Sequence, residues 1–333
     1  MQAVILAAGL GTRLQPVTRD RSKAMVPALG RPLVERALMP YAANGIRDFV
    51  LVVGADDQEI RRHFSGRSDL DVTTRFAVQE ERLGMANALA AAAHLLEGPF
   101  VLSACDSLVS VEHVGEVLRA ADSADAVLSL LEVDMELVAR SASVELDGVR
   151  VRRIVEKPAP GEAVSNTVSL PHYVFPRRLI DRLPGVGRSA RGEYEIQDAI
   201  QALIDDGETV VGIRAEDRYQ VSTPEDLLAL TIRLLREEVE PTQTATAQVG
   251  AGTDLIGPFR IEAGVEIGDH CEIGPDVYLE SGSSVGNGAV IRESVVLRNA
   301  RVLADQRVVG KILSSLVSAS RTALSPPGFP DEN

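Results

Sequence analysis

Cysteine, histidine and long apolar runs are scarce in this sequence, and each shortage argues against a class of protein. The 333 residues include only 2 cysteines, Cys105 and Cys271, and these form no CxxC motif. We therefore expect buried structural thiols in a reducing compartment rather than a disulfide framework. The histidines show no metal-ligand spacing. No apolar run approaches the roughly 20 residues that span a bilayer, and the N-terminus lacks the features of a secretory signal. We expect a cytoplasmic protein.

Basic residues are also in deficit. Lysine and arginine total 34 against 48 aspartates and glutamates, which gives a formal net charge of −14. Such a protein repels nucleic acid and anionic membranes, so we expect neither as a partner. The composition, with 45% hydrophobic and 25% charged residues, is that of a soluble globular protein. A chain of this length exceeds one compact core and predicts two domains.

The first two-thirds of the chain alternates strand-like apolar runs with helical patterns. The strand-like runs include "AVILAA", "DFVLVVG", "PFVLSAC" and "DAVLSLLEV". This alternation predicts an α/β fold, with a doubly wound, mostly parallel sheet and helices on both faces. A hairpin is expected around Asp147-Gly148. The last helical pattern begins at "STPEDL", where Ser222 or Thr223 is the expected cap.

The last part of the chain carries a six-residue repeat. Ten aliphatic residues recur at this spacing: Leu255, Ile261, Ile267, Ile273, Leu279, Val285, Ile291, Leu297, Leu303 and Val309. The pattern predicts a parallel β-helix of about three coils, with each repeated side chain pointing inward. It resembles the short left-handed parallel β-helix of many transferases.

These patterns predict four segments along the chain. The α/β domain occupies 1–240, and the weakly patterned residues 241–252 form a linker. The β-helix with a terminal helix occupies 253–320, because "VGKILSSLVSASRTAL" reads as a helix that caps the last coil. Residues 321–333 form a flexible tail.

A glycine-rich turn follows the first predicted strand. It is not a P-loop, because no GKS or GKT closes it, and it is not a dinucleotide fingerprint, because Leu14 stands at the third glycine position. Its full spacing is Gly9-x-Gly11-Thr12-Arg13-Leu14-x-Pro16-x-Thr18-x4-Lys23-x-Met25-x-Pro27. This pattern closely resembles the sugar-1-phosphate nucleotidylyltransferases, whose domain has a Rossmann-like fold. The resemblance covers residues 1 to about 238, and a C-terminal β-helix is a common partner of that domain.

The resemblance implies a donor site for a nucleoside triphosphate. Gly9 and Gly11 would let backbone N–H groups approach the base and the phosphates. Arg13 would offset charge on the departing pyrophosphate, and Lys23 would do so at the α phosphate. A carboxamide both donates and accepts, so Gln79 suits a pyrimidine edge and favours UTP or dTTP. The implied nucleotide-binding residues are Leu6, Ala8, Gly9, Gly11, Thr12, Arg13, Gln79 and Gly84.

The resemblance also implies a Mg²⁺ ion. Asp106 ends an apolar strand, where open α/β sheets bind ligands, and matches the metal aspartate of the family. Cys105 takes the place of the glycine that usually precedes this aspartate. Gln220 stands where relatives carry a second metal aspartate, so we expect weaker or water-mediated metal binding there.

An acceptor pocket is implied by a further set of residues: Ser143, Glu156, Lys157, Ser169 and Glu193. Glu193 fits equally well as an exposed acid near the start of a helix. Ser143 and Ser169 replace a glycine and an asparagine of the family. This suggests an acceptor such as a modified sugar, cyclitol or polyol phosphate. His172, three residues after Ser169, is a further candidate for the acceptor side.

Three functions remain open. The first is Mg²⁺-dependent transfer of a nucleoside monophosphate to a sugar 1-phosphate or a sugar-like phosphate, with release of pyrophosphate and with Arg13, Lys23 and Asp106 as catalytic residues. The second, motivated by Gln220, is a non-catalytic or regulatory relative that binds nucleotide sugar and assembles through its β-helix. An added acyl transfer would need a histidine base, but His270 is expected to point outward. Because β-helix extensions often self-associate, we expect a homo-oligomer.

Overall fold

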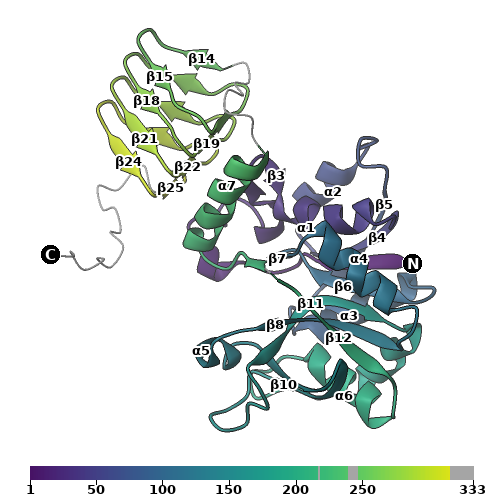
Figure 1. The fold of residues 1–333 in the computed structure, drawn as a ribbon. Helices are drawn as coiled ribbons and strands as arrows, with labels where there is room; N and C mark the ends of the chain where they lie inside the picture. Colours follow the sequence, from purple (N-terminus) through teal and green to yellow (C-terminus); the bar gives the residue numbers. More distant parts are fainter. Residues whose placement is uncertain (217, 239–246, 316–333) are drawn as a thin grey trace, which may run out of the picture. The chain divides into compact units, whose positions relative to one another are not determined.

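The computed structural model describes residues 1–216, 218–238 and 247–315, and the described chain forms two compact units (Figure 1). The sheet unit comprises Met1–Arg13, Asp20–Pro27 and Arg31–Ser222. The β-helix unit comprises Leu14–Arg19, Ala28–Gly30 and the described residues from Thr223 onward.

A nine-stranded sheet forms the centre of the sheet unit, in the order β5-β4-β1-β6-β11-β8-β12-β10-β9. Strands β11 and β10 run opposite to the others, so the predicted, mostly parallel sheet is confirmed. The strand bounds are β1 (Gln2–Leu6), β4 (Asp48–Gly54), β5 (Thr73–Gln79), β6 (Phe100–Ala104), β8 (Ala126–Glu132), β9 (Ala142–Asp147), β10 (Arg150–Glu156), β11 (Thr167–Phe175) and β12 (Val210–Arg214).

Helices cover both faces of this sheet, because successive strand residues point to opposite sides. On β8, Leu128 packs in the hydrophobic core shared with α3 (Met85–Ala92) and α6 (Ile196–Asp205). The next residue, Ser129, bonds instead to His113 of α4 (Val111–Ala120) on the other face.

The remaining elements before Thr223 are short helices and strands. They are η1 (Thr12–Leu14), η2 (Lys23–Met25), β2 (Pro27–Ala28), β3 (Arg31–Pro32), α1 (Leu33–Ala43), α2 (Gln58–Phe64), η3 (Ala93–Leu95), β7 (Ser107–Leu108), α5 (Met135–Val138), η4 (Arg177–Gly185) and β13 (Tyr219–Gln220). The predicted hairpin at Asp147-Gly148 is confirmed by the antiparallel pairing of β9 with β10.

Helix α7 (Pro224–Glu238) belongs to the β-helix unit, although the sequence pattern places it in the first domain. Its cap is Thr223, whose Oγ1 accepts a hydrogen bond from Asp226 N at 3.3 Å, while the Asp226 carboxylate accepts from Thr223 N at 2.8 Å. This reciprocal pair is a capping box. Near the other end of α7, Arg236 forms an ion pair with the buried Asp276 of the β-helix, which explains why the helix groups with that unit.

Three parallel four-stranded sheets form the sides of the β-helix. Their strands are β14 (Gln248–Val249), β17 (Glu266–Ile267), β20 (Ser284–Val285) and β23 (Arg301–Val302); β15 (Asp254–Leu255), β18 (Glu272–Ile273), β21 (Val290–Arg292) and β24 (Arg307–Val309); and β16 (Phe259–Ile261), β19 (Val277–Leu279), β22 (Ser294–Val296) and β25 (Ile312–Leu313). Four strands on each side exceed the about three coils expected from the repeat.

Two predicted boundaries therefore move. Strand β14 lies inside the segment 241–252 that was expected to be a linker. It belongs to the first coil, because Val249 pairs with Ile267 of the next coil. The last residue of β24 and the whole of β25 lie in the first part of the predicted terminal helix, because Leu313 pairs with Val296 and extends the third side. The rest of that predicted helix and the predicted tail lie outside the described residues.

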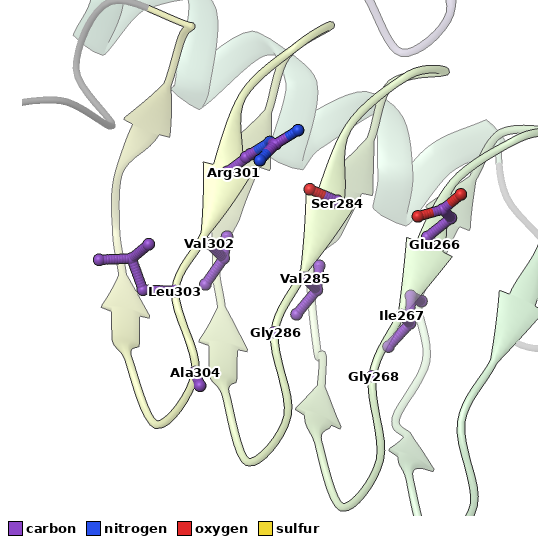
Figure 2. Close-up of a pocket in the computed structure, with 10 residues that line it drawn as sticks. All are labelled: Glu266, Ile267, Gly268, Ser284, Val285, Gly286, Arg301, Val302, Leu303 and Ala304. Atoms are coloured by element: carbon purple, nitrogen blue, oxygen red, sulfur yellow. The ribbon is translucent and has the colours of Figure 1, made fainter.

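The inward register changes by one residue after Ile291, because Leu279 pairs with Val296. Up to Ile291 the repeat holds, since Ile267 pairs with Val285 and Ile273 with Ile291. The next coil is one residue shorter, because Val285 pairs with Val302 and Ile291 with Val308. The predicted inward positions Leu297, Leu303 and Val309 are therefore wrong: Val296, Val302 and Val308 belong to the core in their place, and the side chains of Leu303 (Figure 2) and Val309 are exposed.

His270 is exposed in a turn with φ +56°, which agrees with the expectation that it points outward. None of the helices among the described residues has the length and apolar character needed to cross a bilayer.

Two adjacent valines test the corrected register. Val308→Ala removes buried methyl groups and should lower the free energy of unfolding by about 2 kcal/mol. Val309→Ala is the matched control and should change it by less than about 0.5 kcal/mol, because Val309 is 40% exposed. Denaturant titration of both variants measures the difference. Equal effects, or a larger effect at Val309, would contradict the register.

Candidate active site

The carboxyl ends of β1, β4, β5 and β6 lie at one edge of the sheet, because these neighbouring strands are parallel (Figure 1). Ligands of open α/β sheets bind at such an edge. The glycine-rich loop follows β1, Gln79 ends β5, and Asp106 follows β6. The structure thus brings together residues that lie about one hundred positions apart in the sequence.

The glycine-rich loop is anchored at its start and open at its middle. Ala7 N donates to the carbonyl of Val52 at 2.8 Å, and both Ala7 and Ala8 are buried. Gly9 is exposed, and a Cβ there would meet nothing within 4 Å, so this stretch of backbone borders open space. Thr12 and Arg13 are exposed and Leu6 is half-buried. The arrangement leaves room for a ligand along the loop.

Arg82 is a cation of this site that the sequence reasoning missed. Its Nε donates to the carbonyl oxygen of Ala8 at 2.6 Å. Its guanidinium also lies against Gly54, the last residue of β4, where a Cβ would collide with Nη2. Arg82 therefore spans from β4 to the glycine-rich loop and adds positive charge beside Gly9. The signal available in the sequence was a single arginine in the loop "QEERLG".

Hydrogen bonds fix the orientation of the Gln79 side-chain amide. The side chain is buried, and its Nε2 donates to Asn87 Oδ1 at 2.7 Å and to the carbonyl oxygen of Gly84 at 3.3 Å. A backbone carbonyl only accepts, so it requires the amide nitrogen on this side. The Oε1 atom accepts no hydrogen bond from the described part of the chain.

The loop after Gln79 is paired with the segment that precedes α6. Tyr194 N donates to Leu83 O at 2.7 Å, and Ala86 N donates to Tyr194 O at 3.0 Å. Between them, Gly84 has φ +97°, and a Cβ there would lie 2.6 Å from Tyr194 O. Only glycine fits this position. The predicted base-binding loop and the predicted acceptor segment around Glu193 are therefore in direct contact.

Lys23, Asp106 and Gln220 form one cluster. Lys23 is 7% exposed, and its Nζ forms an ion pair with Asp106 Oδ2. Gln220 Nε2 donates to the same oxygen at 3.0 Å, and the pairing of β7 with β13 places Ser107 opposite Gln220. Cys105 beside Asp106 is buried, and burial raises its pKa to about 12, so this thiol stays neutral.

Opposite charges gather on the predicted acceptor side. Glu156 at the end of β10 lies 3.4 Å from Lys157 Nζ and 3.6 Å from Arg191 Nη2. Arg191 also contacts the buried Glu195 at 2.6 Å. Burial raises the pKa of Glu156, and Lys157 and Arg191 oppose this shift. Arg191 and Glu195 were missed from the sequence. Glu193 is half-buried near Gly84 and forms no ion pair with the described residues.

The two serines predicted to bind the acceptor differ in their hydrogen bonds. Ser143 Oγ donates to Ser165 O at 2.9 Å and accepts from Val164 N and Ser165 N, each at 3.1 Å. A hydroxyl has one donor and two lone pairs, so this side chain has no capacity left for an acceptor. Its predicted role is therefore not supported. Ser169 Oγ lies 3.1 Å from Tyr173 OH in a buried pair close to Glu156.

A match to a family model shows which protein family this chain belongs to. The nucleotidyl transferase model matches residues 2–236. This chain belongs to the nucleotidyl transferase family. A bacterial transferase hexapeptide model, with six repeats, matches residues 264–299.

Curated relatives and solved structures agree with this assignment. This nucleotidyl transferase is 34% identical over 247 residues to a UTP–glucose-1-phosphate uridylyltransferase of Haloferax volcanii, covering 73% of this chain and 100% of the relative. It is 30% identical over 355 residues to a glucose-1-phosphate thymidylyltransferase of Streptomyces griseus, covering 100% and 96%. A solved UDP-glucose pyrophosphorylase with UDP-glucose bound has the same fold, with a TM-score of 0.65 at 18% identity, over 71% of this chain and 99% of the other.

His172 of this nucleotidyl transferase lies in a buried polar cluster. Its Nδ1 is 2.8 Å from Tyr41 OH and 3.1 Å from Ser103 Oγ, and its Nε2 is 3.1 Å from Ser107 Oγ. Burial lowers the pKa of His172 to about 3, so the ring is neutral at pH 7. The ring thus hydrogen-bonds to Ser107, the residue that follows Asp106. The possibility that it faces the acceptor is not supported.

The His172 ring should make the protein acid-sensitive. Its folded pKa lies below the unfolded value of about 6.5, so the unfolded chain binds more protons between these two values. The free energy of unfolding should fall by up to about 1.4 kcal/mol for each pH unit below about 6. Denaturant titrations at several pH values measure this slope.

The control for this prediction is His172→Gln, which keeps a neutral hydrogen-bonding side chain. It should flatten the pH dependence even if it lowers stability at every pH. An unchanged slope in this variant would show that other groups cause the acid sensitivity.

Proposed function

We propose that this protein transfers a nucleoside monophosphate from UTP or dTTP to a sugar 1-phosphate and releases pyrophosphate. The observation that carries the proposal is the Lys23–Asp106–Gln220 cluster, which lies at the same sheet edge as the glycine-rich loop and Gln79. The names of two relatives, a uridylyltransferase and a thymidylyltransferase for glucose 1-phosphate, describe this chemistry.

The reaction joins one phosphate to another. An oxygen of the acceptor phosphate forms a bond to the α phosphorus of the nucleotide, and the bond from that phosphorus to pyrophosphate breaks. The protein forms no covalent bond, so its contribution is position and neutralisation of charge. Lys23, held against Asp106, suits the α phosphate, and the exposed Arg13 suits the departing pyrophosphate.

Gln79 supports the choice of base. With its amide nitrogen engaged by Asn87 and Gly84, its Oε1 can accept from the N3–H of uracil or thymine. Cytosine has no N3–H and presents an acceptor to this oxygen. We therefore propose UTP or dTTP rather than CTP as the donor.

Mg²⁺ is proposed as the cofactor, and the donor set at Asp106 fits it. Among the described residues no three histidines, cysteines or carboxylates gather as a metal-binding group. Mg²⁺ is commonly held by one or two carboxylates together with substrate phosphates, so Asp106 is sufficient when a triphosphate is present. When bound, the ion would neutralise phosphate charge. Gln220 donates to Asp106 in this structure and would hold that carboxylate in place.

The acceptor would bind among the charged groups around Glu156. Lys157 and Arg191 can hold a phosphate, and Glu156 and Glu195 can accept hydrogen bonds from hydroxyls. Because Ser143 is fully bonded within the protein, the argument for an unusual acceptor rests on Ser169 and its partner Tyr173. Cyclitol and polyol phosphates stay in the proposal as alternatives to a sugar 1-phosphate. Both cysteines are free and buried, which supports a cytoplasmic setting.

Gln220 also favours a second candidate, a relative that binds nucleotide sugar without turnover. The resemblance to the family implies a carboxylate at this position, which this chain lacks. The ion pair of Lys23 with Asp106 supports the active enzyme instead, because a binding protein has no need of it.

A substrate panel tests the proposed function. Purified protein with Mg²⁺ should release pyrophosphate from UTP or dTTP with a sugar 1-phosphate, and much more slowly from CTP, ATP or GTP. Lys23→Met should lower kcat/KM by about a hundredfold or more, because it removes the buried cation. Arg307→Met, an exposed change in β24, is the matched control. Absence of turnover with every sugar, cyclitol and polyol phosphate would favour the binding protein.

A carboxylate at position 220 tests the role of Gln220 in metal binding. Gln220→Asp adds negative charge beside Asp106, so half-maximal activity should need about tenfold less Mg²⁺. The Mg²⁺-dependent rise in melting temperature should move in the same direction. Gln220→Leu removes the donor without adding charge and should not improve Mg²⁺ binding. Equal Mg²⁺ requirements in the wild type and Gln220→Asp would contradict a metal site at Asp106 that reaches Gln220.

A further inference from the structure

Two side-chain amides lie in contact at the sheet edge that forms the candidate site. Gln79 ends β5, and Asn87 lies in the first turn of α3, which begins directly after Gly84. Gln79 Nε2 donates a hydrogen bond to Asn87 Oδ1 at 2.7 Å. Gln79 is buried and Asn87 is half-buried. The pair therefore lies beside Gly84, in the segment that the sequence predicts to bind the base of a nucleotide.

One backbone carbonyl fixes the orientation of both amides. The carbonyl oxygen of Gly84 only accepts, so its contact of 3.3 Å requires the nitrogen of Gln79 on that side. Because the same nitrogen contacts Asn87, the Asn87 amide must turn its oxygen toward Gln79. Both hydrogens of Gln79 Nε2 are then used within the protein. Gln79 presents only Oε1 to a ligand, as a hydrogen-bond acceptor.

The amide nitrogen of Asn87 keeps its full capacity to donate. Asn87 Nδ2 forms no hydrogen bond with the described residues, and both of its hydrogens can donate. A carboxamide carries its nitrogen next to its oxygen, so this donor lies close to Gln79. The two side chains together offer an acceptor, Gln79 Oε1, and a neighbouring donor, Asn87 Nδ2.

Uracil and thymine carry the complementary pattern along one edge. Their N3–H is a donor that lies between two carbonyl oxygens, both of which accept. Cytosine has no hydrogen on N3 and repels Gln79 Oε1 at this position. Guanine has an N–H beside one carbonyl oxygen, but it is a larger base. The pair of amides therefore suits the imide edge of a pyrimidine better than a single glutamine does.

We propose that Asn87 is a second base-reading residue, which donates from Nδ2 to a carbonyl oxygen of uracil or thymine while Gln79 Oε1 accepts from N3–H. This inference rests on the proposed function, since it names a residue that selects the UTP or dTTP of that reaction. A base that lacks either group leaves one of the two amide atoms unpaired in the complex, which weakens binding. The loss of one such neutral hydrogen bond corresponds to roughly two- to tenfold in affinity.

Calorimetric titration with nucleotides in Mg²⁺ buffer, without an acceptor, tests this role independently of turnover. The probes are UTP, 2-thio-UTP and 4-thio-UTP. Each thio analogue keeps N3–H and replaces one carbonyl oxygen by sulfur, which accepts hydrogen bonds weakly. The wild type should bind at least one analogue about three- to tenfold more weakly than UTP. For that analogue, Asn87→Ala should reduce the difference to less than about twofold, because the donor has been removed.

Asn87→Asp separates donation to the base from the orientation of Gln79. The carboxylate keeps an oxygen for Gln79 Nε2 and removes the donor. Its negative charge weakens the binding of every triphosphate alike, so the measured quantity is the ratio of the dissociation constants of the thio analogue and UTP. This ratio should fall to about one or below. Asn87→Asp also serves as the test if Asn87→Ala does not fold, which melting temperatures check.

Gln248→Glu is the matched control. It makes the same amide-to-carboxylate change at an exposed position of β14 and should leave both the ratio and the affinity for UTP as in the wild type.

The possible results separate this role from the proposed function. Wild-type ratios that persist in both Asn87 variants, or a wild type that binds both analogues as tightly as UTP, would contradict the role of Asn87. Failure of the wild type to bind UTP and dTTP would overturn the proposed donor together with that role. The expected ratios without turnover of any acceptor would support the role of Asn87 and contradict only the proposed reaction.

Discussion

The ion pair between Lys23 and Asp106 is the interaction on which the candidate site depends. Lys23 is almost completely buried, and a buried ammonium is strongly unfavourable unless it is paired. Asp106 supplies that pairing from the end of β6, and Gln220 supports the same carboxylate oxygen from β13. The loop after the first strand and the loop after the fourth strand of the parallel set are thereby fixed to each other. A triphosphate entering between them meets a cation that the fold has already desolvated.

The parts of the site that followed from the sequence depend on short spacing or on strand order. Gly9 to Lys23 form one local pattern, and Gln79 and Asp106 each end an apolar run. Because parallel strands align their carboxyl ends, these residues had to converge once the alternation of strands and helices was recognised. His172 shows the limit of this reasoning. Its strand was evident, but the side that it faces depends on a register shift between Leu170 and Tyr173 that no sequence pattern reported.

The residues that sequence reasoning missed act through contacts between distant segments. Arg82 bonds to the carbonyl of Ala8, and Arg191 lies against Glu156; an arginine in a loop gives no sign of such a partner. The three hydrogen bonds of the Ser143 hydroxyl were missed for the related reason that their partner atoms lie about twenty residues away. In the β-helix the count by six failed after Ile291, because the pairs Val296-Leu297, Val302-Leu303 and Val308-Val309 satisfy either register. Only the strand pairing distinguishes them.

The backbone pairing of Tyr194 with Leu83 and Ala86 has a consequence for protein engineering. These backbone hydrogen bonds join the segment that would recognise the base to the segment that carries Arg191 and Glu195. Substrate preference at one pocket therefore cannot be redesigned as an independent module. A substitution near Glu195 that shifts this segment would carry Gly84 with it and change the nucleotide that the enzyme accepts. Gly84 itself cannot be substituted, because a Cβ there would collide with Tyr194 O. The base preference therefore has to be altered at neighbouring residues such as Asn87.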